Sequence, residues 1–92
     1  MNPKNVIEKN RKKIDRINEK IIYLIAERNK LVKEIGLAKK KLGMKVVDRK
    51  REKEVLENSR KIAEKMKVDP KIAEKIMKIL IEYARKIQGA KK

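Results

Sequence analysis

The sequence predicts an all-α fold of three helices, on the strength of three observations. Apolar residues recur every seven positions through the first 42 residues. Helix-start signals follow at Asp48 and at Asp69-Pro70. No segment carries a strand signal, an internal repeat or a linker composition. We therefore expect one domain over residues 1–92, with helices over about 4–41, 49–67 and 70–88.

The first predicted helix is very long, about 57 Å at 1.5 Å per residue. Gly36 interrupts it at a cost of about 1 kcal/mol, which packing must offset. The apolar seam that runs along it has two rows, Ile7, Ile14, Ile21, Ile35 and Leu42 in one and Ile17, Leu24, Leu31 and Ala38 in the other.

The second and third helices are predicted from their caps and their apolar stripes. Asp48 is a suitable N-cap, and Asp69 is followed by Pro70 at the first helical position. Each helix is about 28 Å long, so the two together match the first. Such a thin body has little interior, and we expect the exposed seam to pair with a second copy in a two-fold dimer. The stripes are Val55, Leu56, Ile62, Ala63 and Met66 in the second helix, and Ile72, Ile76, Met77, Leu80, Ile81 and Ala84 in the third.

Composition restricts the chemistry that this chain performs. It has no Cys and no His, which excludes disulfides, thiolate nucleophiles, imidazole bases and the usual zinc sites. We expect no cofactor and no metal. The N-terminus lacks an apolar signal core and no apolar run is long enough to span a membrane, so we expect a cytoplasmic protein without a membrane partner. The net charge of +16 is spread along the whole chain.

Arg28 occupies a position on the apolar seam where an aliphatic residue is expected. A guanidinium stays charged, and burying one without a partner costs several kcal/mol, so we expect an anion to meet it. Lys39 lies eleven residues further on, which returns it to nearly the same helix face about 16 Å away. Val32 and Ile35 lie between the two cations. This strip suits a small anionic ligand.

Arg11 lies seventeen residues before Arg28, about 100° around the helix and 25 Å away, so it cannot reach the strip of its own chain. An antiparallel partner whose two-fold axis crosses near residues 21–22 would place residue 11 opposite residue 33. Arg11 is then expected to serve the site of the other copy. Alone, it would be interpreted as an exposed arginine.

Polar residues also interrupt the stripes of the other two helices. Arg51 and Glu52 lie one turn before the apolar residues of the second helix, and the backbone N–H groups after Asp48 suit an anion or a hydroxyl. Gln88 shares a helix face with Met77, Ile81 and Ala84. Glu52 could instead be present because the helix dipole favours a carboxylate at a helix N-terminus, and Gln88 could mark a frayed helix end. Together they predict a polar, cationic interior site.

The chain resembles the all-helical chorismate mutases in three stretches. These are LIAERNKLVKEIGLAKK over residues 24–40, VVDRKREKEVLE over 46–57 and ILIEYARKIQ over 79–88. The resemblance covers nearly the whole chain and implies an intertwined homodimer with two active sites, each completed by one arginine of the other chain. It also implies the isomerisation of chorismate to prephenate in aromatic amino acid biosynthesis (the shikimate pathway), a one-step rearrangement without a base or a covalent intermediate.

The resemblance implies a role for each site residue. Arg28, with Arg11 from the partner, would bind the two substrate carboxylates, and Lys39 and Gln88 would donate hydrogen bonds to the ether oxygen. Glu52 would accept from the ring hydroxyl. The backbone N–H of Asp48 would assist Glu52, and Arg51 would support the charged cluster. The pocket would be lined by Val32, Ile35, Ile81 and Ala84. At position 84 the family often has a hydroxyl residue, which this chain replaces with alanine.

Three other functions fit parts of the sequence. An isochorismate pyruvate-lyase of the same fold would use the same cations. A basic helical dimer could bind nucleic acid, which the net charge favours. Three observations argue against nucleic-acid binding: the basic residues are dispersed, two tyrosines are the only aromatic residues in the sequence, and Arg28 and Lys39 lie on the apolar seam. We therefore expect no nucleic-acid partner. A structural coiled coil would leave Arg51, Glu52 and Gln88 unexplained.

Overall fold

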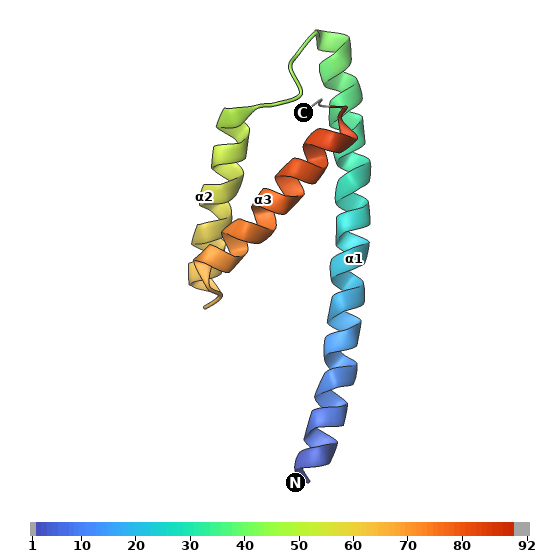
Figure 1. Ribbon diagram of the computed structural model, residues 1–92, viewed down its shortest axis with the longest axis vertical. Coiled ribbons are helices and arrows are strands. Elements are labelled where there is room, and N and C mark those ends of the chain that lie inside the picture. The colour runs from blue at the N-terminus through green and yellow to red at the C-terminus, as the bar shows by residue number, and fades with distance from the viewer. Residues whose placement is uncertain (1, 90–92) are drawn as a thin grey trace. The chain divides into compact units, whose positions relative to one another are not determined.

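The chain is described by a computed structural model, which covers residues 2–89; Met1 and residues 90–92 of the predicted domain lie outside the described part. The described residues form three helices and no strand, which confirms the all-α prediction: α1 (Pro3–Leu42), α2 (Arg49–Lys65) and α3 (Pro70–Ile87) (Figure 1). They divide into an N-terminal unit, which ends at Leu31, and a C-terminal unit, which begins at Val32. None of the three helices has the length and hydropathy of a membrane span.

The starts of α2 and α3 are set by the caps that the sequence predicts. The Asp48 carboxylate accepts a hydrogen bond from the backbone N–H of Arg51 at 3.1 Å. The Asp69 carboxylate accepts from the N–H of Lys71 at 2.9 Å, and Pro70 occupies the first turn of α3. Each cap pairs a donor that has no partner within the helix, which fixes where the helix begins.

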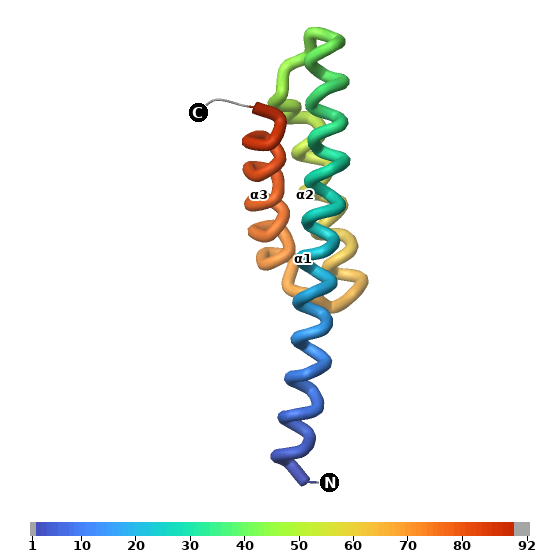
Figure 2. Tube along the Cα trace, turned by 90° about the vertical axis from the view of Figure 1, so that its right-hand side faces the viewer, coloured from blue at the N-terminus to red at the C-terminus, as the bar shows by residue number. Residues whose placement is uncertain are grey.

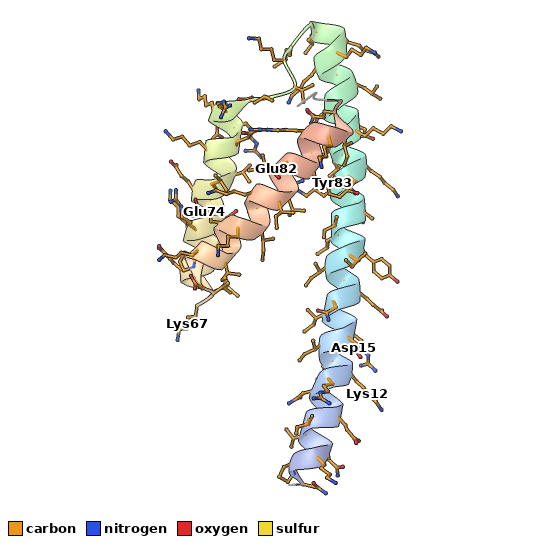
Figure 3. All side chains as sticks on the ribbon, viewed as in Figure 1. Lys12, Asp15, Lys67, Glu74, Glu82 and Tyr83 are labelled. Carbon is orange, nitrogen blue, oxygen red and sulfur yellow. The ribbon has the colours of Figure 1, made fainter. Side chains whose placement is uncertain are left out.

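The end of α2 differs from the prediction, since the helix stops at Lys65. Lys67 adopts a left-handed conformation with φ of 58° at the tip of the turn that leads into α3 (Figure 3). The N–H of Val68 donates to the carbonyl of Ala63 at 2.8 Å, and the N–H of Lys67 donates to that of Glu64 at 3.3 Å. This is a Schellman motif. Glycine usually occupies the left-handed position of this motif, so a lysine there does not predict the end of the helix from the sequence.

Helices α2 and α3 pack side by side as an antiparallel hairpin (Figures 1 and 2). Ala63 of α2 and Ile81 of α3 are 4% and 8% exposed, and Val32 of α1 is 7% exposed. These three are the buried hydrophobic residues among those described. The C-terminal unit therefore has a very small core, and the half-buried side chains beside it are Val55, Leu56, Met77, Leu80 and Ala84.

Four residues predicted to point inward are exposed in the single chain. They are Ile62 of α2, Met66 at the C-cap of that helix, and Ile72 and Ile76 of α3. Two helices that contact each other bury only the rows that face one another, so the flanking apolar rows stay open to solvent. The hairpin consequently keeps an apolar surface that it cannot cover by itself.

The N-terminal unit is one helical segment without a buried residue among positions 2–31. Ile14, Ile17, Ile21 and Leu24 are each about half exposed or more. Most of the stability of a helix in a protein comes from packing its apolar face, and this unit supplies nothing to pack against. Its seam therefore requires another surface.

Candidate functional site

Lys39 and Gln88, separated by 49 positions in the sequence, meet in the C-terminal unit. The Lys39 ammonium donates to the Gln88 amide oxygen at 3.0 Å and to the backbone carbonyl of Val46 at 2.7 Å. Lys39 lies in the last turn of α1, and Gln88 is the residue that caps the C-terminus of α3. Both side chains are half-buried. The connection after α1 thus turns a backbone carbonyl towards the ammonium.

The orientation of the Gln88 amide follows from its partner. Lysine can only donate, so the amide oxygen faces Lys39 and the amide nitrogen faces away. That nitrogen donates to the carbonyl of Val32 at 3.4 Å, a long and weak bond. Lys39 uses two of its three N–H groups within the described chain, and the amide uses one of its two. One donor on each side chain therefore remains for a ligand.

Gly36 explains how Gln88 comes so close to α1. A Cβ built at Gly36 would lie 2.9 Å from the Cγ of Gln88 and 3.3 Å from its Cα, closer than carbon atoms normally approach. The glycine that weakens the first helix thus makes room for the amide. Sequence reasoning identified the cost of Gly36 but not this contact.

Glu52 is paired with Arg85, a residue that the sequence reasoning did not include in the site. Arg85 Nε donates to Glu52 Oε2 at 2.8 Å, and Arg85 Nη2 donates to Glu52 Oε1, which makes a two-point ion pair between α2 and α3. The hydrogen bonds with Glu52 raise the pKa of the Arg85 guanidinium above its ordinary value. Arg85 lies four residues after buried Ile81 and three before Gln88, and this helical spacing is the signal that could have revealed it.

An open groove of about 210 Å³ borders this ion pair. Leu56 and Ile81 form its apolar part. Glu82 lies on the side of α3 that faces α2 (Figure 3) and lines the groove together with Lys78. Lys78 also lies 3.7 Å from Glu74, one turn earlier in the same helix.

Two expectations at the start of α2 require correction. Arg51 does not point along the buried stripe: its side chain is 64% exposed and lies 3.6 Å from Glu54, one turn along the same helix. The backbone N–H of Arg51 is also taken, because the carboxylate of Asp48 accepts from it. That group is therefore occupied in the cap.

The remaining predicted site residues fall into two groups. Arg11 and Arg28 belong to the N-terminal unit, where Arg11 is exposed and Arg28 is half-buried. Arg28 already takes part in an interaction, so an unsatisfied charge is no argument for a ligand there. The predicted lining residues of the C-terminal unit differ in exposure: Val32 and Ile81 are buried, Ala84 is half-buried and Ile35 is half exposed.

The described residues thus define a small all-helical protein in which a lysine ammonium and a glutamine amide from distant parts of the sequence form a cationic, polar cluster. Comparison with known proteins identifies the family. Residues 10–89 match the chorismate mutase type II family. The chain is also 45% identical over 78 residues to a protein named chorismate mutase from Methanocaldococcus jannaschii, a match covering 85% of this chain and 79% of that protein. The chain belongs to the chorismate mutase type II family, which confirms the predicted family and the isomerase class.

Proposed function

We propose that this chain converts chorismate to prephenate by positioning its substrate and stabilising the charge that develops in the transition state. The observation that carries the proposal is the contact between Lys39 and Gln88. Both side chains can donate hydrogen bonds at neutral pH, and they come from the ends of different helices. Membership of the family supports the reaction. The residue roles and the assembly described next are part of the same proposal.

In this rearrangement one C–O bond breaks and one C–C bond forms within a single molecule, with no proton transferred. Negative charge grows on the ether oxygen, so donors aimed at that atom stabilise the transition state more than the substrate. Lys39 and the amide nitrogen of Gln88 each keep one donor for this purpose. The bond from Lys39 to the amide oxygen also polarises the amide and strengthens its N–H groups as donors.

The substrate carries two carboxylates, which require cations at fixed positions. Arg28 and Arg11 of the partner subunit would hold them in the compact conformation that brings the reacting carbons together. Glu52 would accept a hydrogen bond from the ring hydroxyl, assisted by the backbone N–H of Asp48, and Arg51 would support the charged cluster. Val32, Ile35, Ile81 and Ala84 would line the pocket, with Ala84 lacking the hydroxyl group often present in the family.

A homodimer is proposed because the apolar surfaces need a cover. The exposed apolar residues form continuous rows along the N-terminal unit and along the hairpin, whereas a monomeric protein usually exposes such residues singly. In an intertwined two-fold pair, the long helix α1 of each copy would bury this seam against the other. The whole chain, residues 1–92, would then act as one domain. A cytoplasmic location stays a prediction from the sequence.

The direct test is an assay of the purified protein with chorismate, and with isochorismate in parallel to detect lyase activity. Lys39→Ala is expected to lower kcat about 10²- to 10³-fold, the usual cost of one transition-state donor. Lys40→Ala is the matched control, because Lys40 is the exposed neighbour on the same helix turn. Release of pyruvate from isochorismate without prephenate formation would refute the mutase assignment. Equal turnover of both variants would refute the role of Lys39.

A further inference from the structure

The ion pair between Arg85 and Glu52 joins the last turn of α3 to the first turn of α2. Both carboxylate oxygens of Glu52 take part, one with Nε and one with Nη2 of the same guanidinium. Such a two-point contact fixes the plane of the carboxylate as well as its distance, which a single hydrogen bond does not. The side chains are 31% and 19% exposed for Arg85 and Glu52, so the pair lies at the edge of the protein interior.

Fixing the carboxylate still leaves it able to accept another hydrogen bond. The two oxygens have about four lone-pair sites in total, and Arg85 occupies one on each. The adjoining groove gives a small molecule access to the remaining sites. A hydroxyl that enters from the groove would therefore meet an acceptor that is already oriented.

The other charged groups at the groove do not replace Arg85 in this task. Lys78 lies beside Glu74 and carries a single ammonium, which cannot form the planar two-point contact. Glu82 adds a second negative charge beside Glu52, and its attraction also raises the pKa of the Arg85 guanidinium. Arg85 thus offsets two carboxylates while it orients one of them.

We propose that Arg85 is a positioning residue that holds the Glu52 carboxylate in the orientation required to accept the ring hydroxyl of the substrate. The inference rests on the role proposed above for Glu52. Arg85 acts through Glu52 and has no assigned contact with the substrate. It extends the site by a residue that the sequence alone did not place there.

The expected effect of losing Arg85 follows from the freedom that Glu52 would gain. Two tetrahedral torsions with about three wells each give about nine rotamers, so an unheld carboxylate spends roughly a tenth of its time correctly placed. Because the hydroxyl contact is present in both the bound substrate and the transition state, the loss falls on KM. Arg85→Gln is expected to raise KM for chorismate up to about tenfold and to change kcat less than twofold.

A double-mutant cycle separates positioning from a merely structural role. The variants are Arg85→Gln, Glu52→Gln and the double variant, with Arg60→Gln as control because Arg60 is an exposed arginine of α2. Glu52→Gln is expected to raise KM, and adding Arg85→Gln to it is expected to have almost no further effect. Arg85→Lys keeps the charge but not the fork, so it is expected to raise KM as well, and it serves if the glutamine variant fails to fold.

The outcomes are distinguishable. If Glu52→Gln raises KM while neither Arg85 variant does, the positioning role of Arg85 is wrong and the function of Glu52 stands. If Arg85→Gln raises KM equally with and without Glu52, Arg85 acts independently of Glu52 and the inference is also wrong. If Glu52→Gln leaves KM unchanged, the role proposed for Glu52 fails together with the inference that depends on it.

Discussion

Replacing Gln88 with Glu tests whether this side chain donates to the ether oxygen. Glutamate has the same shape as glutamine but donates a hydrogen bond only when its carboxyl is protonated. The Lys39 ammonium, which lies 3.0 Å from the present amide oxygen, would favour the ionised form and lower the pKa of the new carboxyl. The variant should therefore be active only where the solution is acidic enough to protonate that group.

The size of the effect follows from the ordinary pKa of a glutamate side chain, about 4.3. At pH 7 at most about one molecule in 500 would carry the proton, and the shift caused by Lys39 makes that fraction smaller. Loss of one donor costs about 10²- to 10³-fold in kcat. We therefore expect kcat of Gln88→Glu to be about 10²- to 10³-fold below that of the unmodified protein at pH 7, and to recover by up to about tenfold per pH unit towards pH 5.

The measurement is kcat with chorismate between pH 4 and 8, for the unmodified protein, Gln88→Glu and Gln88→Ala. The alanine variant cannot donate at any pH, so its ratio to the unmodified protein should stay low and flat. A Gln88→Glu variant whose relative activity does not rise towards acid pH would show that residue 88 does not face the ether oxygen. Near-normal activity of Gln88→Ala would lead to the same conclusion.

Two further predictions concern the assembly and the turn after α2. The Arg11→Ala and Lys39→Ala variants should each be nearly inactive. Refolding the two variants together should restore about a quarter of the original activity, because half of the dimers are mixed and each mixed dimer has one intact site. No recovery of activity would show that Arg11 does not act across subunits. Lys67→Gly should raise the free energy of unfolding by about 0.5–1 kcal/mol, because glycine adopts the left-handed conformation of residue 67 without steric cost. Lys61→Gly, at an exposed position inside α2, should lower it by about 1 kcal/mol. A thermal melt compares these two variants, and a lower midpoint for Lys67→Gly would contradict the Schellman interpretation.

Local signals predicted the helices well because their causes are local. Asp48 and Asp69 cap their helices through hydrogen bonds to residues two and three positions away, and such contacts depend only on nearby sequence. Lys67 shows the limit of this reasoning. Its left-handed conformation is imposed by the turn between two packed helices and not by any preference of lysine, so α2 ends earlier than expected.

The candidate site was only partly predictable. The family resemblance placed Lys39, Glu52 and Gln88 in one site, and the contact between Lys39 and Gln88 agrees with that placement. The exposure of the Arg51 side chain was not predicted, because helical spacing does not show whether a charged side chain at the edge of a face turns to solvent. Arg85 was missed because its partner lies 33 positions away, and only the packing of α2 against α3 brings the two together.

Residue identity and short spacing were enough to predict the helical class, the starts of α2 and α3, and the family. The tertiary structure decided which donors pair and which carboxylate is held by which arginine. Gly36 shows why. Its missing side chain matters only because Gln88, which is distant in the sequence, packs so close that a Cβ at position 36 would lie 2.9 Å from the Cγ of Gln88. Contacts of this kind arise from packing, and no local pattern encodes them.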